Sequence, residues 1–420
     1  MSRCRVKRDG RESRRARLSP VARVSRGAYT TRSLSEMSND MQARAWVEVD
    51  LDALADNYRA VREAVGAHPA IIAMVKADAY GLGAERVVRA LERLEPWGYG
   101  VATADEGAAL RDFGVRRPIV IFGPLPPAAV ERAARARLVA TISDLPALER
   151  WRAGAAAAGQ TLDFHVEIDT GMGRAGFDWR DTPEWGPAVK ALAARGGVRW
   201  TGVMTHFHGA DSADATASST QWARFEDALA QLPVSREDLM VHAANSAAAL
   251  RWPEYAADAV RPGIFLYGGH PGRDTADIAP PRPVAAVRAR LVLVRKVAPG
   301  STVGYGATHV AREWERWGTL AIGYGDGLPR RLGNCGSAIV RGRVVPFVGR
   351  ISMDMTVVDI TGVPEARAGD VATLIGSDGD ARITLDDVAE RAETISYEIL
   401  TGLRPRLPRV EKGAWIETSS

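Results

Sequence analysis

The segment Ile71–Gly81 (IIAMVKADAYG) carries the pattern that decides the fold. Its first part, Ile71–Val75, is a short continuous apolar run, which is typical of a strand buried on both faces in a parallel sheet. Lys76 follows at the C-terminal end of that strand. In a barrel of parallel strands this lysine points into the mouth, where burial lowers its pKa and suits it to Schiff-base formation. A surface lysine at a strand end is the competing interpretation.

Outward from this segment, apolar runs alternate with Ala-rich amphipathic stretches. The expected strands are Ile71–Val75, Gly98–Ala102, Ile119–Phe122, Val139–Ile142, Phe164–Ile168, Gly202–Thr205, Met240–Ala243 and Gly263–Tyr267. The expected helices are Ala84–Leu94, Ala104–Phe113, Ala128–Ala136, Leu145–Ala158, Thr182–Ala194 and Ser219–Leu232. About eight strand–helix alternations are typical of a parallel (β/α)₈ barrel. A doubly wound sheet is the main alternative, and the lack of a G-x-G-x-x-G motif after the first strand counts against it.

Two further regions flank the barrel pattern. Trp46–Leu51 alternates like a strand, and Asp52–Val65 has helical spacing. Beyond the Pro-rich break at Pro280–Pro283, β-branched runs separated by Gly and charged turns predict a smaller, mostly antiparallel β domain. Its expected strands are Arg290–Lys296, Thr319–Ile322, Ser337–Val340, Val344–Val348, Met355–Ile360 and Asp370–Ile375, with helices at Leu385–Arg391 and Ser396–Thr401. The expected boundaries are 1–44 for a disordered basic extension, 45–280 for the barrel and 281–418 for the β domain.

Composition excludes several classes of protein. The 420 residues are 46% hydrophobic and 25% charged, as in ordinary globular proteins, and no apolar run is long enough to cross a membrane. The net charge of +4 divides unevenly, because the first 40 residues hold eleven basic and four acidic side chains and leave the rest at −3. A mildly acidic body gives no reason to expect nucleic acid as a partner. Two cysteines, Cys4 and Cys335, favour a reducing cytoplasm.

The basic start of the chain admits three interpretations. It has an arginine pair, Arg14-Arg15, but no apolar stretch of the kind that a secretory signal needs. Its Arg- and Ser-rich composition loosely resembles a transit peptide. A disordered extension, or translation that begins at Met37 or Met41, is the interpretation that composition favours.

Motifs spread over nearly the whole chain, from Trp46 to about Trp415, resemble those of bacterial alanine racemases. Besides the Lys76 segment they are Asp169–Arg174 (DTGMGR), Thr205–Phe207 (THF), Asn245–Ala247 (NSA), Arg261–Ile264 (RPGI), Val303–Gly306 (VGYG), Gly349–Met355 (GRISMDM) and Tyr397–Leu400 (YEIL). One such piece would be weak evidence, whereas all of them in order are specific. The resemblance implies a barrel that binds pyridoxal phosphate, an appended β domain that includes the strand at 46–51, and a head-to-tail homodimer.

The resemblance also implies two catalytic bases. Lys76 would hold the cofactor and move a proton on one face of the substrate Cα, and Tyr305 of the other subunit would act on the opposite face. A tyrosine needs a cationic or hydrogen-bonding neighbourhood to act as a base at neutral pH. His206 and Arg261 match the family positions that link to this tyrosine and to the cofactor ring. Without the motif, Tyr305 would be interpreted as a packing aromatic residue.

Further cofactor contacts follow from the same matches. Arg261 would face the pyridine nitrogen, and because a guanidinium only donates hydrogen bonds it would leave that nitrogen unprotonated, which limits side reactions such as transamination. Backbone groups of Gly263 and Ile264 and the hydroxyls of Tyr80, Ser246 and Tyr397 would hold the phosphate, with Asn245 in support. Taken singly, these Ser and Gly residues would pass for ordinary turn residues.

The substrate carboxylate is assigned to Arg174 and to the backbone of Met353, with Asp354 beside it. Many family members have a carbamylated lysine seven residues before the arginine, whereas this chain has Glu167. Glutamate supplies an anion without bicarbonate, so we expect a Glu167–Arg174 pairing. Glu167 paired with some other cation is the alternative.

The resemblance implies interconversion of L-alanine and D-alanine, which supplies D-alanine for peptidoglycan. Other functions compete with this interpretation. A racemase for serine or basic amino acids would share these motifs, and Glu167 leaves room for one. A decarboxylase of the same fold type lacks the context of Tyr305 and Met353, and a pyridoxal-phosphate carrier resembles the barrel alone. His208 and His242 receive no role, and no residues have metal-ligand spacing.

Overall fold

The structure is a computed structural model that describes residues 43–272 and 277–413. Most of the basic extension expected over residues 1–44 lies outside the described residues, and so do Cys4 and the two candidate start methionines, Met37 and Met41.

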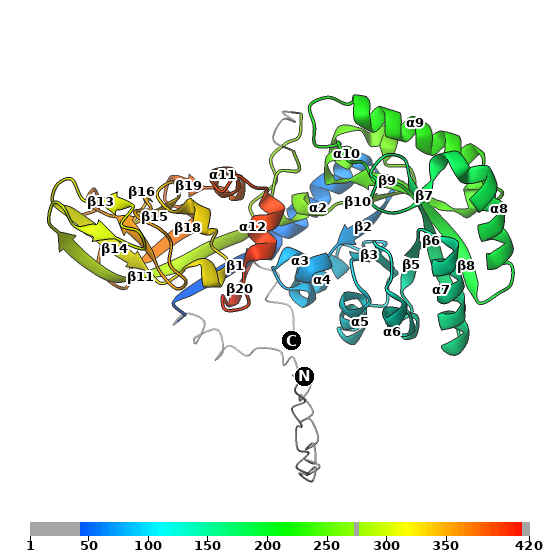
Figure 1. The fold of residues 1–420 in the computed structure, drawn as a ribbon, viewed down its shortest axis with the longest axis horizontal. Coiled ribbons are helices and arrows are strands. Elements are labelled where there is room, and N and C mark those ends of the chain that lie inside the picture. The colour runs from blue at the N-terminus through cyan, green and yellow to red at the C-terminus, as the bar shows by residue number, and fades with distance from the viewer. Residues whose placement is uncertain (1–42, 273–276, 414–420) are drawn as a thin grey trace, which may run out of the picture. The chain divides into compact units, whose positions relative to one another are not determined.

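Eight parallel strands form a closed barrel (Figure 1). They follow the order β5-β4-β3-β2-β10-β9-β8-β6, and pairing of β5 with β6 closes the ring. The strands are β2 (Ala70–Met74), β3 (Gly98–Val101), β4 (Ile119–Ile121), β5 (Val139–Ile142), β6 (Leu162–Asp169), β8 (Val198–Met204), β9 (Met240–Asn245) and β10 (Ala259–Arg261). The predicted barrel is confirmed. Its strands are apolar along nearly their whole length because core and helices cover both faces.

Amphipathic helices cover the outside of the barrel (Figure 1). They are α2 (Leu51–Val65), α4 (Ala84–Glu92), α5 (Ala104–Asp112), α6 (Val130–Arg135), α7 (Leu145–Ala157), α8 (Thr182–Ala193), α9 (Thr216–Ala230) and the short α10 (Ser246–Arg251). Several begin at a side-chain cap. Thr103, for example, accepts the N–H of Glu106, whose carboxylate accepts the N–H of Thr103 in return. Such reciprocal bonds satisfy two donors that a helix start otherwise leaves unpaired.

A second, mostly antiparallel sheet forms the β domain, as predicted. It contains β1 (Ala45–Asp50), β11 (Ala285–Val297), β14 (Glu315–Leu320), β15 (Ser337–Val340), β16 (Arg343–Pro346), β17 (Thr356–Asp359), β18 (Val371–Asp378), β19 (Ala381–Ile383) and β20 (Arg409–Lys412). The first strand, β1, lies in this sheet, antiparallel to β11 and parallel to β20. Helices α11 (Leu385–Arg391) and α12 (Ser396–Gly402) complete the domain (Figure 1).

Short elements occupy the loops. They include α3 (Lys76–Tyr80), β7 (Phe177–Asp178), β12 (Thr302–Val303) and β13 (His309–Val310). The described parts of the chain also contain seven 3₁₀ turns, at Pro127–Ala129, Trp179–Asp181, Arg236–Asp238, Pro253–Tyr255, Ile264–Tyr267, Tyr324–Asp326 and Arg330–Leu332. None of these turns was predicted, because three or four residues are too few for a periodic pattern.

One strand prediction is wrong. The apolar run Gly263–Tyr267 is not the eighth barrel strand, because β10 ends at Arg261 and Ile264–Tyr267 is a 3₁₀ turn closed by Gly268 at φ 84°. All four side chains of that turn are fully buried. A short apolar run without alternation therefore fits a buried strand and a buried turn equally well. The correction places Gly263 and Ile264 in the loop after β10, at the barrel mouth.

Several contacts join the barrel to the second sheet, and one of them is made by a buried amide. The side chain of Asn57 on α2 donates to the carbonyls of Leu266 and Arg282 and accepts the N–H of Arg282, at 2.7–3.2 Å. This ties the loop after β10 and the residues before β11 to the same helix. Within the described ranges, no helix is long and apolar enough to cross a membrane.

Candidate active site

The C-terminal ends of the parallel strands meet at one mouth of the barrel, and most of the predicted site residues follow them. Lys76 comes after β2, Glu167 lies two residues before the end of β6, His206 comes after β8, Ser246 after β9, and Arg261 ends β10. This is the mouth at which barrels of this architecture hold their reactive groups.

Lys76 begins an unusual left-handed turn. Ala77, Asp78, Ala79 and Tyr80 all have φ between 52° and 56°. Such a conformation costs about 1–2 kcal/mol per residue for L-amino acids, so the turn needs external support. The N–H of Ala77 donates to Oε1 of Glu106 at 2.7 Å, and Oδ1 of Asp78 accepts the N–H of Ala84 at 2.7 Å. These bonds fix the backbone on which the lysine side chain stands.

The charge of Lys76 is destabilised. Burial and the cationic Arg174 and Arg261 lower the pKa of its ammonium group, while Glu106 partly opposes them. Each of these effects follows from electrostatics: burial penalises a charged group, and like charges repel it. Lys76 is thereby inclined toward the neutral amine, the form that attacks a carbonyl carbon or takes up a proton.

Arg261 is a buried cation held by neutral acceptors, and only 4% of the residue is exposed. Its Nη2 donates to the carbonyls of Thr205 and Ala243 at 2.8 Å and contacts Nδ1 of His206 at 3.2 Å. Its Nη1 lies 2.9 Å from Nδ1 of His242. Burial lowers the pKa of Arg261 to about 10, so it remains a cation at neutral pH.

His206 stands between Arg261 and the open mouth. Burial first, and then Arg261, Arg174 and Lys76, lower the pKa of its imidazole to about 3, so the ring is neutral. Because Arg261 donates to Nδ1, the ring proton of His206 lies on Nε2. Gln221 on α9 holds this loop by donating to the carbonyl of His206 at 3.0 Å and accepting the N–H of His208 at 2.9 Å.

A set of hydroxyl and backbone groups lies beside Gly263. Its N–H donates to Oγ of Ser246 at 2.8 Å, and a Cβ at this position would lie 2.2 Å from the Tyr80 oxygen, so only glycine fits. The rings of Tyr80 and Tyr397 are 6.0 Å apart, and burial raises the pKa of both phenols. Hydroxyls that stay protonated are hydrogen-bond donors, so the set suits a phosphate group. Asn245 caps α10 by accepting the N–H of Ala248.

Glu167 and Arg174 are not in direct contact. No hydrogen bond or ion pair within 4.0 Å joins these two described side chains; the carboxylate accepts from Ser143 Oγ at 3.4 Å instead. Burial raises the pKa of Glu167, and the positive charges of Arg174 and Arg261 oppose that rise. Arg174 itself is exposed in the single chain. The pairing therefore stays a prediction.

The predicted site residues of the β domain do not belong to the group at the barrel mouth. Tyr305 is 67% exposed and Met353 is 52% exposed. Tyr305 stands between Gly304 and Gly306 (φ 71° and 76°) in the loop from β12 to β13. In Figure 1, β13 lies at the far end of the β domain from α3. No hydrogen bond joins it to Lys76 within the described residues. Asp354 pairs with Arg406 at 2.6 Å, and the Met353 carbonyl accepts the N–H of Gly325.

Sequence reasoning missed several residues that shape this site. Glu106 supports the Lys76 turn, Gln221 supports His206, and the buried Asp326 joins Arg44 and Arg406 beneath the Met353 loop. Gln221 and Asp326 act through contacts with backbone or with residues far away in the sequence, which leave no local motif. Glu106 did carry a signal, because Thr103 and Glu106 have the spacing of a capping box.

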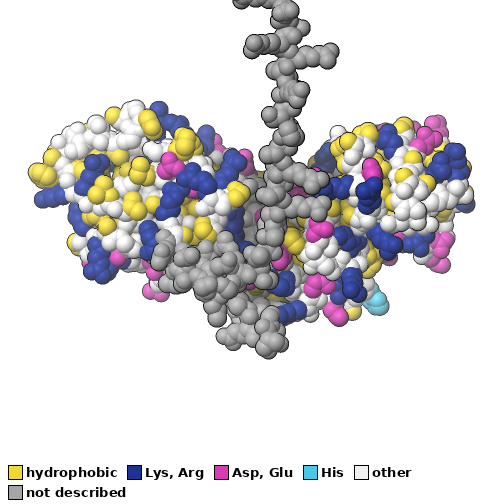
Figure 2. Space-filling view, turned by 90° about the horizontal axis from the view of Figure 1, so that it is seen from below, with side chains coloured by type: hydrophobic (Ala, Val, Ile, Leu, Met, Phe, Trp, Pro, Cys, Tyr) yellow, Lys and Arg dark blue, Asp and Glu magenta, His cyan; other side chains and the backbone are white. Residues whose placement is uncertain are grey.

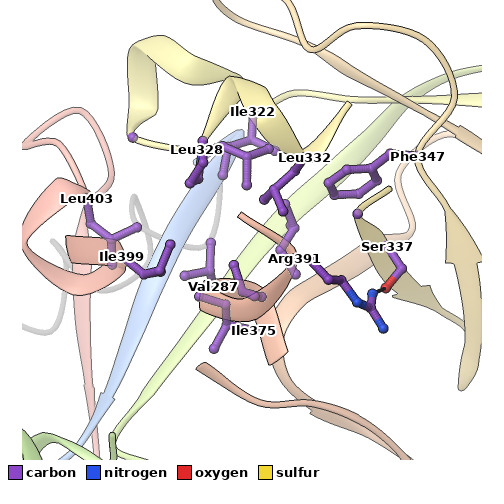
Figure 3. A pocket seen from close by; sticks show the side chains of 15 residues that line it. Val287, Ile322, Leu328, Leu332, Ser337, Phe347, Ile375, Arg391, Ile399 and Leu403 are labelled. Carbon is purple, nitrogen blue, oxygen red and sulfur yellow. Dashed lines mark hydrogen bonds between the residues drawn. The ribbon is translucent and has the colours of Figure 1, made fainter. Parts of the chain in front are cut away.

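A separate cavity in the β domain is not part of this site. Figure 3 shows its lining, which is apolar apart from Ser337 and Arg391 and includes Ile322, Leu332 and Phe347. Its volume is about 20 Å³, room for about one water molecule. It is too small for an amino acid and holds none of the predicted site residues. Within residues 43–272 and 277–413, no group of three or more His, Cys, Asp or Glu side chains is arranged to hold a metal ion.

The residues at the barrel mouth fit pyridoxal phosphate. They combine a lysine inclined toward its neutral form, a buried arginine without a carboxylate partner within 4 Å among the described residues, and the donors beside Gly263. Those features match a carbonyl carbon, a ring nitrogen and a phosphate, respectively.

Comparison with known proteins gives the family. Residues 49–271 match the alanine racemase N-terminal domain, and residues 284–411 match the alanine racemase C-terminal domain. The alanine racemase of Halothermothrix orenii is 36% identical over 377 residues, which cover 90% of this chain and 99% of that protein. The crystal structure of alanine racemase from Streptomyces lavendulae superposes with a TM-score of 0.82 at 36% identity and covers 89% of this chain and 98% of that one. Alanine racemase from Bartonella henselae, solved with covalently bound pyridoxal phosphate, has a TM-score of 0.78 at 29% identity, covering 88% of this chain and all of that one. The chain belongs to the alanine racemase family of pyridoxal-phosphate-dependent isomerases.

Proposed function

We propose that this protein is an alanine racemase that interconverts L-alanine and D-alanine with two bases and pyridoxal phosphate. The observation that carries the proposal is the setting of Lys76, partly buried at the barrel mouth beside the cations Arg174 and Arg261, where its pKa is lowered. A lysine in that setting is inclined toward its neutral amine, the form that can bond to the cofactor's carbonyl carbon and take up a proton.

The residues that would hold the cofactor share one mouth. They are Lys76, Tyr80, Arg174, His206, Asn245, Ser246, Arg261, Gly263, Ile264 and Tyr397. When bound, pyridoxal phosphate supplies an electron sink for the pair left on the substrate Cα when its proton departs. Arg261 would donate to the ring nitrogen and could not accept from it, so that nitrogen would stay unprotonated and the sink would stay weak.

Lys76 and Tyr305 would act on opposite faces of the substrate Cα. With D-alanine, neutral Nζ of Lys76 takes the proton from one face and Oη of Tyr305 gives a proton to the other. With L-alanine the two side chains exchange roles. His206, through its Nε2–H, would stabilise the Tyr305 oxygen when it is deprotonated.

Tyr305 would come from a second subunit in a head-to-tail homodimer. It is 67% exposed, and the β domain also exposes Trp314, Met353 and Met355 by half or more, which supports an interface there. On the face in Figure 2, hydrophobic side chains of the β domain lie among Lys and Arg. In such a dimer each site would need both chains.

Substrate binding would use both domains. Arg174 would hold the alanine carboxylate, with the negative charge of Glu167 orienting its guanidinium, and the backbone N–H of Met353 from the partner subunit would complete the contact. Asp354 would support that loop through its ion pair with Arg406. Because the anion at position 167 is a glutamate, this orientation would need no bicarbonate.

The test of the proposed function uses the purified chain loaded with pyridoxal phosphate. It should interconvert the two alanines and exchange their Cα proton with deuterium from solvent. Lys76→Ala should abolish both and remove the visible absorbance of the lysine-bound cofactor. Tyr305→Phe should keep the cofactor and lose exchange selectively with L-alanine. A loaded wild-type chain that leaves alanine unchanged would overturn the proposal.

The cellular role follows from the product. D-alanine is a component of peptidoglycan, and we place its synthesis by this chain in the cytoplasm, in keeping with only two cysteines among 420 residues. We also propose the domain division 45–280 and 281–418, with the strand at about 46–51 assigned to the second domain, which the pairing of β1 with β11 supports.

A further inference from the structure

Two histidines that none of the proposed steps uses lie in line behind Arg261. Nη1 of Arg261 is 2.9 Å from Nδ1 of His242, and Nε2 of His242 is 2.8 Å from Nδ1 of His165. His165 and His242 come from β6 and β9 and are 2% and 0% exposed. The three side chains therefore form one continuous row of hydrogen bonds inside the barrel.

The arginine fixes where every proton in this row lies. A guanidinium has donors only, so Nδ1 of His242 must accept. A neutral imidazole carries one proton, which for His242 is then on Nε2 and is donated to Nδ1 of His165. His165 in turn carries its proton on Nε2. All hydrogen bonds of the row point the same way, from Arg261 toward His165.

The charges around the pair keep it neutral. Burial, followed by the charge of Arg261, lowers the pKa of His165 to about 3 and that of His242 well below its usual value. The other charged or titratable groups facing Arg261 and His206 at this mouth are the cations Lys76 and Arg174 and the buried Glu167. A second proton on His242 would point an N–H at an N–H of Arg261.

The surrounding residues make room for this pair. A Cβ on Gly202 of β8 would lie 2.5–2.6 Å from ring atoms of His165, so any other residue there would displace the ring. The ring of Phe122 meets His242 edge-on, with 5.9 Å between centroids, and lies 5.5 Å from the Arg261 guanidinium carbon. Packing against Gly202 and Phe122 thus helps to hold the row in place.

The row leaves one end of Arg261 for the mouth. Its Nη1 is held by His242 and its Nη2 by Thr205, Ala243 and His206. The Nε–H and the second N–H of Nη1 have no hydrogen-bond partner among the residues that the structure describes. The pair and the two carbonyls therefore set the plane of the guanidinium, and with it the direction of the donors that remain.

We propose that His242 and His165 form a neutral positioning pair that orients Arg261 toward the cofactor ring in the proposed racemase site. The inference rests on the proposed function for its effect on turnover, but not for its effect on proton positions. A carboxylate in place of His242 would neutralise Arg261, whereas an imidazole holds the guanidinium and leaves its charge intact. The pair would thus keep the cofactor ring a weak electron sink, which would limit loss of cofactor by transamination.

The proton positions are tested first, by ¹⁵N NMR of the full chain labelled at histidine and loaded with pyridoxal phosphate. Of the seven histidines, His206 and the two of the pair should remain neutral Nε2–H forms from pH 5 to 8. The variants His165→Asn and His242→Asn identify the two of the pair by loss of signal. A ring of the pair that titrates within this range, or that carries its proton on Nδ1, overturns the proposal whether or not the chain racemises alanine.

The positioning effect is tested with matched variants. In His242→Asn the amide oxygen can replace Nδ1 as acceptor, whereas in His242→Leu it cannot. We expect kcat to fall by roughly 10–100-fold in His242→Leu, with little change in KM for alanine, and to return to within a few-fold in His242→Asn. Gly202→Ala, which disturbs His165 alone, should give an intermediate loss.

Two readouts separate positioning from general damage. The visible spectrum of the lysine-bound cofactor, recorded without substrate against pH, should change in His242→Leu and Gly202→Ala, and more cofactor should be lost to transamination per turnover. His68→Asn, an exposed histidine before β2, is the control. A folded His242→Leu with an unchanged spectrum and kcat, or a His242→Asn as impaired as His242→Leu at equal thermal stability, overturns the proposal.

Discussion

The barrel mouth and the exposed end of the β domain differ in how far one chain completes them. At the mouth, Arg261, Glu167 and Ser246 are at most 5% exposed and bonded to neighbours in the same chain. At the β-domain end, Tyr305 and Met353 are 67% and 52% exposed. In the proposed function one chain would therefore suffice to hold the cofactor, whereas Tyr305, the proposed second base, would act at the site of another subunit. Substitutions in the two regions should therefore impair the protein in different ways.

The largest effect on activity should come from substituting Lys76 and Tyr305, one residue in each of two chains. Lys76→Ala and Tyr305→Phe should each lower racemisation by about 10²–10⁴-fold, the usual worth of a positioned acid or base. If the dimer is head-to-tail, subunit exchange between the two variants gives hybrids with one intact site and one doubly altered site. Because half of the dimers in an equal mixture are hybrids, activity should recover to about a quarter of wild type.

The control for this mixture is the double variant Lys76→Ala/Tyr305→Phe. Mixed with Tyr305→Phe it can form no intact site, so it should restore nothing. Subunit exchange itself is followed by native mass spectrometry. Hybrids that form without recovering activity would mean that Lys76 and Tyr305 of the same chain work together, and the contrast between the two regions would be wrong.

The next effect concerns the barrel alone and depends on pH. The pKa values of His165 and His206 are lowered to about 3, and that of His242 is lowered as well. Between pH 6.5 and about 3 the unfolded chain binds protons that the folded chain excludes, so stability falls as pH falls. Each imidazole contributes a slope of about 1.4 kcal/mol per pH unit in that range.

Urea unfolding of the loaded protein from pH 7 to 5 measures this slope. His165→Asn should lower the slope by about one histidine's contribution, whereas His68→Asn should follow the wild-type curve. An unchanged slope in His165→Asn would mean that this ring takes up a proton while the barrel stays folded.

Much of the fold was predictable from local pattern, because parallel barrel strands are continuous apolar runs and seven of the eight coincide with strands of the structure. The eighth was misplaced, since Gly263–Tyr267 and β10 are both short, buried and apolar. Family motifs predicted the residues at the mouth, but not what holds them. His165 and His242 are 77 residues apart, and Glu106 is 29 residues from the backbone that it supports. Such contacts exist only once the barrel closes.

A smaller effect is expected from the anion at the mouth. Glu167→Gln removes the negative charge that faces Arg174 and Arg261, which leaves the cations there unbalanced. We expect kcat/KM for alanine to fall about 10-fold, within the range for residues that orient a ligand group. Wild-type activity should not depend on added bicarbonate. Glu184→Gln, on the exposed face of α8, is the matched control. Bicarbonate dependence of the wild type would contradict the role assigned to Glu167.

The smallest effect should come from the support of the Lys76 turn, which belongs to the barrel alone. Glu106→Ala removes the acceptor for the N–H groups of Ala77 and Ala102, at a cost of about 1–3 kcal/mol in stability. It also removes a charge that opposes the lowering of the Lys76 pKa by burial and by Arg174. The acid limb of the D-alanine rate profile should therefore move to lower pH, because Lys76 acts as the neutral amine. Asp105→Asn, an exposed neighbour paired with Arg132, should change neither property. A Glu106→Ala variant that loses stability but keeps the wild-type profile would mean that the turn holds the backbone without tuning the lysine.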